Sequence, residues 1–388
     1  MKYITRSVLI LSLVSLFTDI ASEMLYPVMP LYLESIGFSI VLIGILEGFA
    51  EALAGLSKGY FGKLSDQSKR RLPFVQIGYS LSAIAKPMLA IYTSTVWVFF
   101  SRSIDRLGKG VRTAARDAML SDSSDVYNKA KVFGFHRSMD TLGAVIGPLI
   151  ALIYLYYYPN NYIYLFYIAF IPALLALSST FLLKEKIVLT EQKKYNYNFF
   201  SFLIYWKNSN SSYKKLIIAL ILFALVNSSD VFLLLKAKES GLSDTYLIGV
   251  FIFYNLIYAL FAFPLGVLAD KIGLKKIFIS GLILFAISYF LIAKSTTIVH
   301  FIVVFFVYGM YSAATEGISK AWISNLVSKS DTATAIGLYT SFQSIATMIA
   351  SSITGLIWYN YGSGIAFFIT SISTLIIALF ITKIKEKV

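Results

Sequence analysis

The order of apolar and polar positions divides the chain into twelve long apolar segments separated by polar breaks. A helix needs about 20 mostly apolar residues to cross a bilayer, whereas the strands of a membrane barrel are about half as long and alternate polar with apolar residues. The pattern therefore predicts an all-α polytopic membrane protein with twelve transmembrane helices. The predicted spans are residues 7–33, 39–61, 73–93, 95–120, 131–157, 161–183, 216–237, 244–266, 275–293, 297–324, 332–358 and 363–383.

The composition supports this class, because 57% of the residues are hydrophobic and only 14% are charged. The first segment does not have the pattern of a secretory signal: it is long, carries acidic residues and lacks a clear small-residue cleavage site. The chain has no cysteine, which excludes disulfides, thiol chemistry and cysteine metal sites.

The net charge of +14 could indicate a nucleic-acid partner, but the basic residues lie mainly at the termini and in the even-numbered loops. Only three, Lys236, Lys238 and Lys294, lie in the odd-numbered loops or at the edge of one. This asymmetry follows the positive-inside rule and predicts a multi-pass protein of the cell membrane with both termini in the cytoplasm. No basic face of a soluble module is visible, so nucleic acid is not an expected partner.

The longest polar break separates the first six spans from the last six. We therefore predict an N-terminal six-helix bundle over residues 1–183, a cytoplasmic linker over 184–215 and a C-terminal six-helix bundle over 216–388. The linker contains the apolar core FFSFLIYW between lysines. This core is either a short amphipathic helix along the membrane surface or part of a plain connection.

A turn is repeated between the two halves: GKLSDQSKRR begins at Gly62 and GVLADKIGLKK begins at Gly266. Their glycines and aspartates align at an offset of 204 residues, which indicates an internal duplication with six spans in each half. Asp66 could accept hydrogen bonds from the free N–H groups at the start of a facing helix, where the helix dipole favours an anion. The alternative is a cytoplasmic turn whose lysines only set the topology.

These turns resemble the G-x-L-a-D-[RK]-x-G-[RK]-[RK] signature of the major facilitator superfamily, which lies between spans 2 and 3 and again between spans 8 and 9. The first copy departs from the signature at Gln67 and Lys69. The resemblance implies two pseudo-symmetric six-helix bundles around a central cavity, alternating access, a small-molecule substrate and a monomeric carrier. The candidate gating residues are Gly62, Asp66, Arg70, Gly266, Asp270 and Gly273.

Span 4 contains the stretch DRLGKGVRTAARD, which places charges inside an apolar segment. One face of the predicted helix carries five basic residues at spacings of three and four: Arg102, Arg106, Lys109, Arg112 and Arg116. A charge at the centre of a bilayer costs about 2.5–3.5 kcal/mol. This face must therefore meet water or partner charges rather than lipid.

Partner charges are available at membrane depth in other spans. Two interpretations remain open: most of the charges pair and hold helices in register, or some of them line a substrate or proton path. The candidate substrate and cavity residues are Lys86, Arg102, Asp105, Arg106, Lys109, Arg112, Arg137, Asn227, Asp230 and Glu316.

Spans 1 and 2 each carry two carboxylates one helical turn apart. Two carboxylates on one face repel when both are ionised, which favours proton uptake by one of them. The candidate proton-coupling residues are Asp19, Glu23, Glu47, Glu51, His136 and Asp140. The histidine in this set is either a proton relay or a buried partner of Asp140.

Two further motifs resemble those of efflux proteins in the same superfamily. Arg106-x-x-x-Gly110 in span 4 matches a motif in which the arginine faces acidic residues of span 1. Gly143-x-x-x-Gly147-Pro148 in span 5 resembles the glycine–proline signature of drug/proton antiporters, although the upstream and trailing glycines are missing. Small residues at this spacing permit close helix packing, and a proline bends a span.

We expect proton-coupled export of a small organic compound by antiport, with the proton gradient as the energy source and no cofactor. Substrate and proton would compete at Asp19 and Glu23, with Arg106 biasing their ionisation. The alternative is uptake or facilitated transport of an anion through a basic N-terminal cavity, and a third class is a non-transporting receptor on a carrier fold. No nucleophile–base pair, metal cluster or cofactor motif is recognisable, so an enzyme is not expected.

Overall fold

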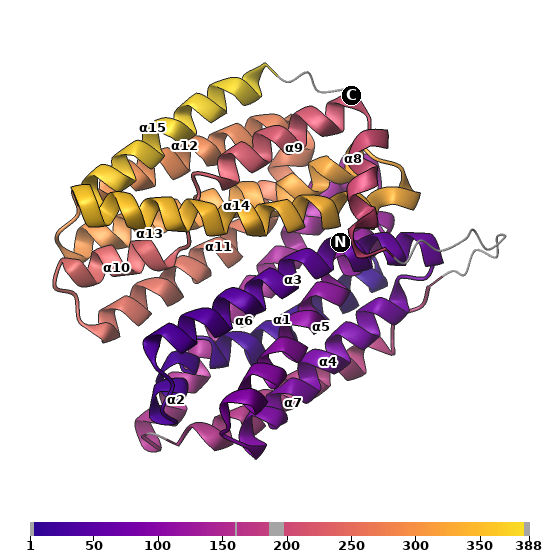
Figure 1. Ribbon diagram of the computed structural model, residues 1–388. Coiled ribbons are helices and arrows are strands. Elements are labelled where there is room, and N and C mark those ends of the chain that lie inside the picture. The colour runs from indigo at the N-terminus through magenta and orange to yellow at the C-terminus, as the bar shows by residue number, and fades with distance from the viewer. Residues whose placement is uncertain (1–3, 160, 186–197, 384–388) are drawn as a thin grey trace. The chain divides into compact units, whose positions relative to one another are not determined.

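The computed structural model describes residues 4–159, 161–185 and 198–383, and these residues form 15 α-helices joined by short connections (Figure 1). The first six predicted spans are the helices α1 (Arg6–Leu25), α2 (Met29–Ser35), α3 (Ile40–Ser68), α4 (Leu72–Ile91), α5 (Thr95–Asp122), α6 (Lys129–Tyr157) and α7 (Tyr162–Thr180). The last six are α9 (Ser211–Ala224), α10 (Val231–Glu239), α11 (Asp244–Ile272), α12 (Leu274–Ile292), α13 (Ile298–Asn325), α14 (Thr332–Tyr361) and α15 (Ser363–Thr382). The all-α class is thus confirmed.

Two of the predicted spans are interrupted. The break between α1 and α2 follows from Pro27 and from Pro30, which lies in the first turn of α2. The expectation of one continuous helix over 216–237 is wrong, because α9 ends at Ala224 and α10 begins at Val231. The intervening sequence LVNSSD contains Asn, Ser and Asp, whose side chains compete with the helical hydrogen bonds of the backbone.

Eight helices of the described chain are both long and apolar enough to cross a membrane on those criteria alone. The predicted spans outside this set have physical reasons to fall short: α3 and α5 carry charges, α14 is rich in serine and threonine, and the seventh span is interrupted. A helix can cross a bilayer without being apolar throughout when its polar side chains face other parts of the protein.

The chain divides into two compact units. Unit 1 comprises Met1–Ser124, Met139–Lys207 and Val327–Ser341, and unit 2 comprises Asp125–Ser138, Asn208–Leu326 and Phe342–Val388. The first turns of α6 therefore belong to unit 2, and the first turns of α14 belong to unit 1.

The helix pairings inside the two units repeat. In unit 1, α5 packs against α3 and α4, and α4 also packs against α7; in unit 2, α13 packs against α11 and α12, and α12 also packs against α15. The second set follows from the first when each span is replaced by the span six places later. This agreement is the structural counterpart of the repeated turn in the sequence.

In each unit, a serine hydroxyl of one helix forms hydrogen bonds with backbone groups in the middle of another long helix. In unit 1, the hydroxyl of Ser341 accepts from the Gly59 amide at 3.0 Å and donates to the Gly55 carbonyl at 2.7 Å. These two α3 groups would bond each other directly in a regular α-helix. In unit 2, the Ser138 hydroxyl accepts from the Phe263 amide of α11 at 3.1 Å. Gly59 and Phe263 are 204 residues apart, the offset of the two repeated turns.

The apolar core FFSFLIYW folds as a 3-10 helix, η2 (Phe199–Leu203), followed by the one-turn helix α8 (Ile204–Asn208). Phe202 is 2% exposed, and its ring packs on the α3 backbone at Gly59, in the space that a side chain there would occupy. The Lys63 ammonium donates to the Ser201 carbonyl at 2.7 Å. This part of the linker is therefore fixed to α3 rather than a plain connection, while predicted linker positions 186–197 lie outside the described residues.

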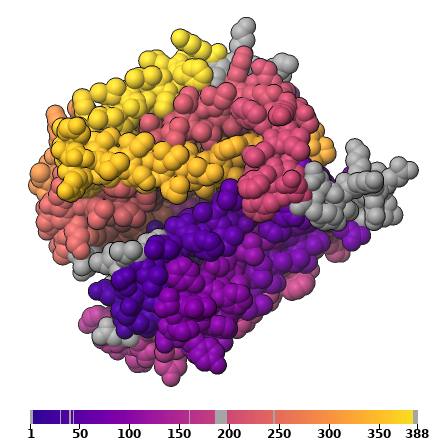
Figure 2. All heavy atoms as spheres, in the orientation of Figure 1, coloured from indigo at the N-terminus to yellow at the C-terminus, as the bar shows by residue number. Residues whose placement is uncertain are grey.

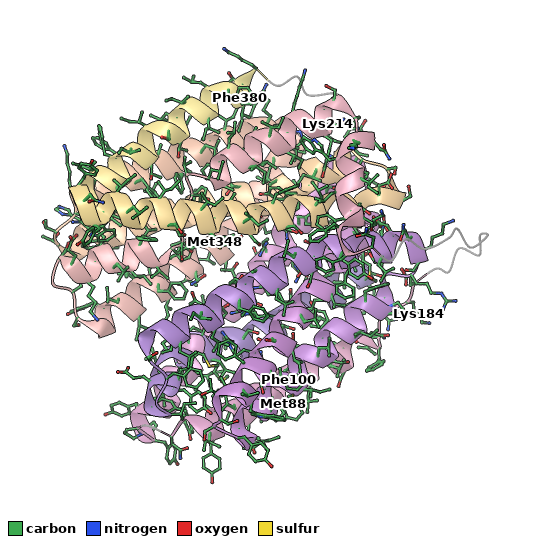
Figure 3. The ribbon with its side chains drawn as sticks, in the orientation of Figure 1. Met88, Phe100, Lys184, Lys214, Met348 and Phe380 are labelled. Carbon is green, nitrogen blue, oxygen red and sulfur yellow. The ribbon has the colours of Figure 1, made fainter. Side chains whose placement is uncertain are left out.

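Large apolar side chains remain exposed on the outer helices, as expected where lipid is the solvent. Phe100 of α5 and Phe380 of α15, both labelled in Figure 3, are 54% and 43% exposed. Figure 2 shows α15, in yellow, at the surface of unit 2. Ile376 and Leu379 on the same helix are also exposed, so α15 presents an apolar stripe of the kind that faces acyl chains.

Candidate functional site: the charged network of unit 1

The basic stripe predicted in span 4 lies on α5, which packs closely on α3 and α4. Glycines permit this approach: a Cβ on Gly108 would lie 2.6 Å from the Gly78 carbonyl oxygen of α4, which is far inside normal contact. Because α5 is enclosed in this way, Arg102 and Arg112 are buried although they are charged. Their charges must be met by polar groups of the neighbouring helices.

Two arginines of α5 pair with the two carboxylates of α3. Arg102 forms an ion pair with Glu47. The Arg106 guanidinium lies 3.1 Å from a Glu51 carboxylate oxygen and 3.7 Å from one of Glu47. The expected pairing of Arg106 with Asp19 and Glu23 is therefore replaced by pairing with α3, because Arg106 lies one turn beyond Arg102 on the face of α5 that packs on α3.

A third pair joins α4 and α5. The Lys86 ammonium lies 2.9 Å from an Asp105 carboxylate oxygen and 3.5 Å from the Ser22 hydroxyl of α1. The Arg102 guanidinium is 3.9 Å from the other oxygen of Asp105. Three carboxylates and three basic groups thus neutralise one another on α3, α4 and α5, and this part of the network fits a role in holding helices in register.

The inner end of the stripe contacts neutral groups as well as charges. Arg112 donates to the Ser82 hydroxyl at 2.5 Å, and its guanidinium lies over the Tyr79 ring at 4.6 Å. Arg116, which was not among the candidates, lies 3.0 Å from the Asp117 carboxylate and donates to the Ser15 hydroxyl at 3.0 Å.

The α1 carboxylates Asp19 and Glu23 differ from the other acids of unit 1. Neither has a hydrogen bond or an ion pair with another described residue. Both are partly exposed within the fold, and the bases that act on them electrostatically include Lys109. Lys109 is exposed and has no carboxylate within 4.0 Å among the described residues. Lys109 is therefore a base near the α1 pair that no other ion pair holds.

The glycine–proline motif of α6 packs directly on the α1 backbone at these two carboxylates. A Cβ on Gly143 would lie 2.5 Å from the Leu16 carbonyl oxygen and 2.8 Å from the Asp19 Cβ. A Cβ on Gly147 would lie 2.7 Å from the Ile20 carbonyl oxygen. One turn farther toward the start of α6, Asp140 accepts a 2.6 Å hydrogen bond from the Ser15 hydroxyl of α1. Gly143 and Gly147 thus allow α6 to pack directly on the turn of α1 that carries the two acids. Pro148 follows Gly147 inside α6.

The remaining candidates lie in unit 2. His136 is 1% exposed, and Arg137 lies 3.3 Å from a Glu316 carboxylate oxygen. Asp230 accepts a 2.6 Å hydrogen bond from the Tyr308 hydroxyl, and the Asn227 side-chain amide donates to the Tyr311 hydroxyl at 3.0 Å. The second-half candidates are thus surrounded by tyrosines more than by charges.

Both repeated turns have their aspartate at the start of another helix. Asp66 accepts from the Thr334 amide at 2.7 Å, near the N-terminus of α14. Asp270 accepts from the Ala130 and Lys131 amides, at 3.0 and 2.8 Å, in the first turn of α6. These are the hydrogen bonds that the sequence predicted for such an aspartate. Gly62 and Gly266 permit the approach, and Gly273 has a φ of 110° between α11 and α12.

The basic partner of Asp66 is Arg71 rather than the candidate Arg70, whose side chain is exposed. The Arg71 guanidinium lies 3.0 Å from Asp66, forms an ion pair with Asp122 and donates to the Lys329 carbonyl at 2.5 Å. Burial raises the pKa of Asp66 to about 6, although the positive charge of Arg71 opposes the shift.

Comparison with known proteins identifies the class that this geometry fits. The family model of the Major Facilitator Superfamily matches residues 11–254 and 216–387. An uncharacterized MFS-type transporter of Methanocaldococcus jannaschii is 31% identical over 383 residues, which is 94% of this chain and 93% of that protein. The chain therefore belongs to the major facilitator superfamily and is a multi-pass secondary transporter, not an enzyme.

More distant similarities extend over the fold or over part of the chain. The quinolone resistance protein NorA of Staphylococcus aureus is 25% identical over 122 residues, 31% of each chain. The human organic anion transporter MFSD10 superposes with a TM-score of 0.82 at 16% identity, covering 97% of this chain and 99% of that one. The Escherichia coli fucose:proton symporter FucP superposes with a TM-score of 0.78 at 13% identity over the full length of both chains. The two structures share the fold.

Proposed function

We propose that the protein exports a small organic compound in exchange for protons, with Asp19 and Glu23 as the coupling pair. The observation that carries this proposal is the isolation of the pair: the acids of α3 and Asp105 are neutralised by bases within 4.0 Å, whereas Asp19 and Glu23 have no such partner among the described residues. Two acids one turn apart at membrane depth favour uptake of a proton. The partial similarity to a quinolone resistance protein is consistent with export.

In the proposed cycle, substrate and proton compete for the same acidic turn. A substrate that approaches Asp19 and Glu23 displaces the proton, and a proton that binds from the other side of the membrane releases the substrate. Lys109 acts together with Arg106 as a base that biases the pair, and it differs from Arg106 in not being held by Glu51 and Glu47. Alternating access of this kind shifts the populations of two conformations through their different affinities for each ligand.

Transport of an anion is the second candidate, and Lys109 is the observation that favours it. Its ammonium is exposed and lacks an ion-pair partner among the described residues, so it could receive an anionic group. Lys86, Arg102 and Arg106 are less suitable, since each already lies within 4.0 Å of a carboxylate. Charge reversal by Lys109→Glu should abolish transport of an anion, but should leave export of a cationic or neutral compound partly intact.

The decisive experiment uses the purified protein in liposomes that contain a pH-sensitive dye. Cationic, neutral and anionic compounds are loaded in turn, and an outward gradient is imposed. For antiport, we expect the lumen to acidify as the compound leaves, and we expect Asp19→Asn and Glu23→Gln each to lower this proton flux at least about tenfold. Glu34→Gln, at an exposed carboxylate of α2 outside the network, is the matched control and should not change the flux.

Two results would contradict the proposal. Alkalinisation of the lumen as the compound leaves would indicate co-transport of substrate and proton. Movement of an anion without any pH change, and with equal rates in both acid variants, would instead support the anion path at Lys109.

A further inference from the structure

The break in the seventh span combines irregular backbone with polar side chains at membrane depth. Six residues, 225–230, separate α9 from α10. The Ser229 amide in this segment donates to the Ser351 hydroxyl of α14 at 3.0 Å, so its hydrogen bond leaves the helix. Secondary transporters hold substrates and coupling ions where membrane helices are discontinuous, because the interruption frees backbone oxygens inside the protein.

Asp230, at the end of the break, carries a negative group without a basic partner. Its carboxylate accepts from the Tyr308 hydroxyl at 2.6 Å, and no basic side chain of the described chain lies within 4.0 Å of it. Asp230 is also the N-cap of α10 and makes no side-chain capping hydrogen bond. The positive end of the helix dipole favours an anion at this position, and a buried carboxylate without a basic partner needs a positive charge beside it to stay ionised.

Oxygen atoms without hydrogen-bond partners gather at the same break. The Ser228 hydroxyl, the Tyr289 hydroxyl and the Asn227 side-chain carbonyl are buried and have no partner among the described residues. Ser228 is 2% exposed and Tyr289 is fully buried. The Tyr289 and Tyr308 rings lie 6.3 Å apart, and the Tyr308 hydroxyl donates to Asp230, so Tyr289 lies beside the residue that holds the carboxylate. Buried polar atoms without partners are uncommon in proteins, and a bound water or ion is one explanation for them.

We propose that this break binds one monovalent metal cation, Na⁺, held by the Asp230 carboxylate, the Ser228 hydroxyl, the Asn227 side-chain carbonyl and the tyrosine hydroxyls. All of these donors are hard oxygens, which suit cations of this kind better than transition metals. One carboxylate among neutral donors is balanced by a single positive charge, whereas a divalent ion would leave a buried net charge.

The size of the site also favours a small ion over an organic ammonium group. Tyr254, Tyr308 and Tyr311 are each at most 7% exposed, and the centroids of neighbouring rings lie 5.2 Å apart. Closely packed rings beside Asp230 suit a small ion better than an organic ammonium group with alkyl substituents. The proposed site lies in unit 2 and shares no residue with the coupling pair of α1, so neither proposal depends on the other.

The test measures binding of radioactive ²²Na⁺ to the purified full-length protein, together with the midpoint of thermal unfolding in NaCl, KCl and choline chloride at equal ionic strength. We expect saturable binding and a midpoint that rises with NaCl but not with choline chloride. Asp230→Asn should abolish both effects, and Ser228→Ala should weaken the Na⁺ affinity about tenfold or more, as is typical when a metal site loses a supporting group.

The matched control is Glu239→Gln at the other end of α10. Glu239 is already satisfied by the Lys236 ammonium at 2.8 Å and the Ser363 hydroxyl at 2.7 Å, so its loss should leave the Na⁺ effect unchanged. Ser228→Ala decides the question if Asp230→Asn fails to fold. Without a bound cation, removal of an unbonded buried hydroxyl raises the midpoint equally in all three salts.

Three outcomes overturn the site. The first is no Na⁺ binding and no NaCl effect at pH 6 or pH 8.5, which would indicate that Asp230 holds a proton only. The second is undiminished binding in Asp230→Asn, and the third is the salt-independent rise in Ser228→Ala. None of these outcomes would affect the proton fluxes assigned to Asp19 and Glu23, which are measured separately.

Discussion

The contact between Gly59 of α3 and Phe202 of the linker predicts that one substitution has opposite effects in two backgrounds. A Cβ on Gly59 would lie 2.6, 2.7 and 2.8 Å from three atoms of the Phe202 ring. We expect Gly59→Ala to destabilise the attachment of the linker in the native sequence. In a Phe202→Ala background, the same change should be stabilising, because the ring with which the new methyl group collides is gone.

The magnitudes follow from the geometry. Normal carbon–carbon contact is about 3.5–4.0 Å, so the ring must move by about 1 Å, and overpacking of this kind costs about 1–3 kcal/mol. Alanine instead of glycine in a helix gains up to about 1 kcal/mol. The net effect of Gly59→Ala on the free energy of unfolding is therefore a loss of up to about 2 kcal/mol with Phe202 present and a gain of up to about 1 kcal/mol without it, so the two backgrounds differ by about 1–3 kcal/mol.

The absence of native cysteine makes the assay simple. A single cysteine in place of Ser201, which is buried while η2 is attached, reacts with a thiol reagent when η2 detaches, so its labelling rate reports the clash with Phe202. The gain in helix propensity is read from the free energy of unfolding. A loss of about 1.4 kcal/mol should raise the labelling rate about tenfold. Gly48→Ala, also on α3 but with no atom within 4 Å of its Cβ, is the control for helix propensity alone. Equal effects of Gly59→Ala in both backgrounds, within about 0.5 kcal/mol, would refute the reasoning.

Two further predictions concern Asp66 of the repeated turn and Gly147, where α6 packs on α1. Because burial raises the pKa of Asp66 from 3.8 to about 6, its contribution to stability is complete below pH 4 and is lost as the pH rises through 6, by up to about 3 kcal/mol. Asp66→Asn should remove this dependence from thermal unfolding curves between pH 4 and 8, and an unchanged slope would contradict the assignment. Gly147→Ala should lower the free energy of unfolding by about 1–3 kcal/mol, since its Cβ meets the α1 backbone at 2.7 Å. The same change at Gly48 should not lower it, and a native-like Gly147→Ala would show that α1 and α6 separate easily.

The fold was largely predictable because lipid imposes long apolar segments, and the predicted spans are helical apart from the two breaks and a few residues at their ends. Pro27 and Pro30 indicate the first of these breaks, because proline interrupts a helix. The second was missed because Asn, Ser and Asp also occur inside membrane helices, so NSSD alone does not separate a break from a polar turn of helix. The extent of α9 and α10 depends on partners such as Ser351, which only the folded chain supplies.

The candidate site was less predictable, because pairing depends on how each helix is rotated about its axis. The spacing on α5 places Arg102 and Arg106 on one face, but it does not say whether α1 or α3 meets that face. At the repeated turn, the sequence offers two adjacent arginines. Lys69 has a φ of 53°, a left-handed conformation that usually requires glycine. This turn leaves Arg70 exposed while Arg71 pairs with Asp66. Lysine does not signal such a turn, and only the glycine of the family signature at this position indicates it.

The serine hydroxyls that enter α3 and α11 mean that part of the backbone hydrogen bonding of each helix is encoded elsewhere in the chain. The Ser341 hydroxyl bridges the Gly55 carbonyl and the Gly59 amide, although it lies nearly 300 residues away in the sequence. In the other unit, the Ser138 hydroxyl accepts from the Phe263 amide. Evolution of these helices is therefore coupled to two distant codons. Loss of either serine would have to be compensated by a regular helical bond in its host, and with it by a different course of the helix axis.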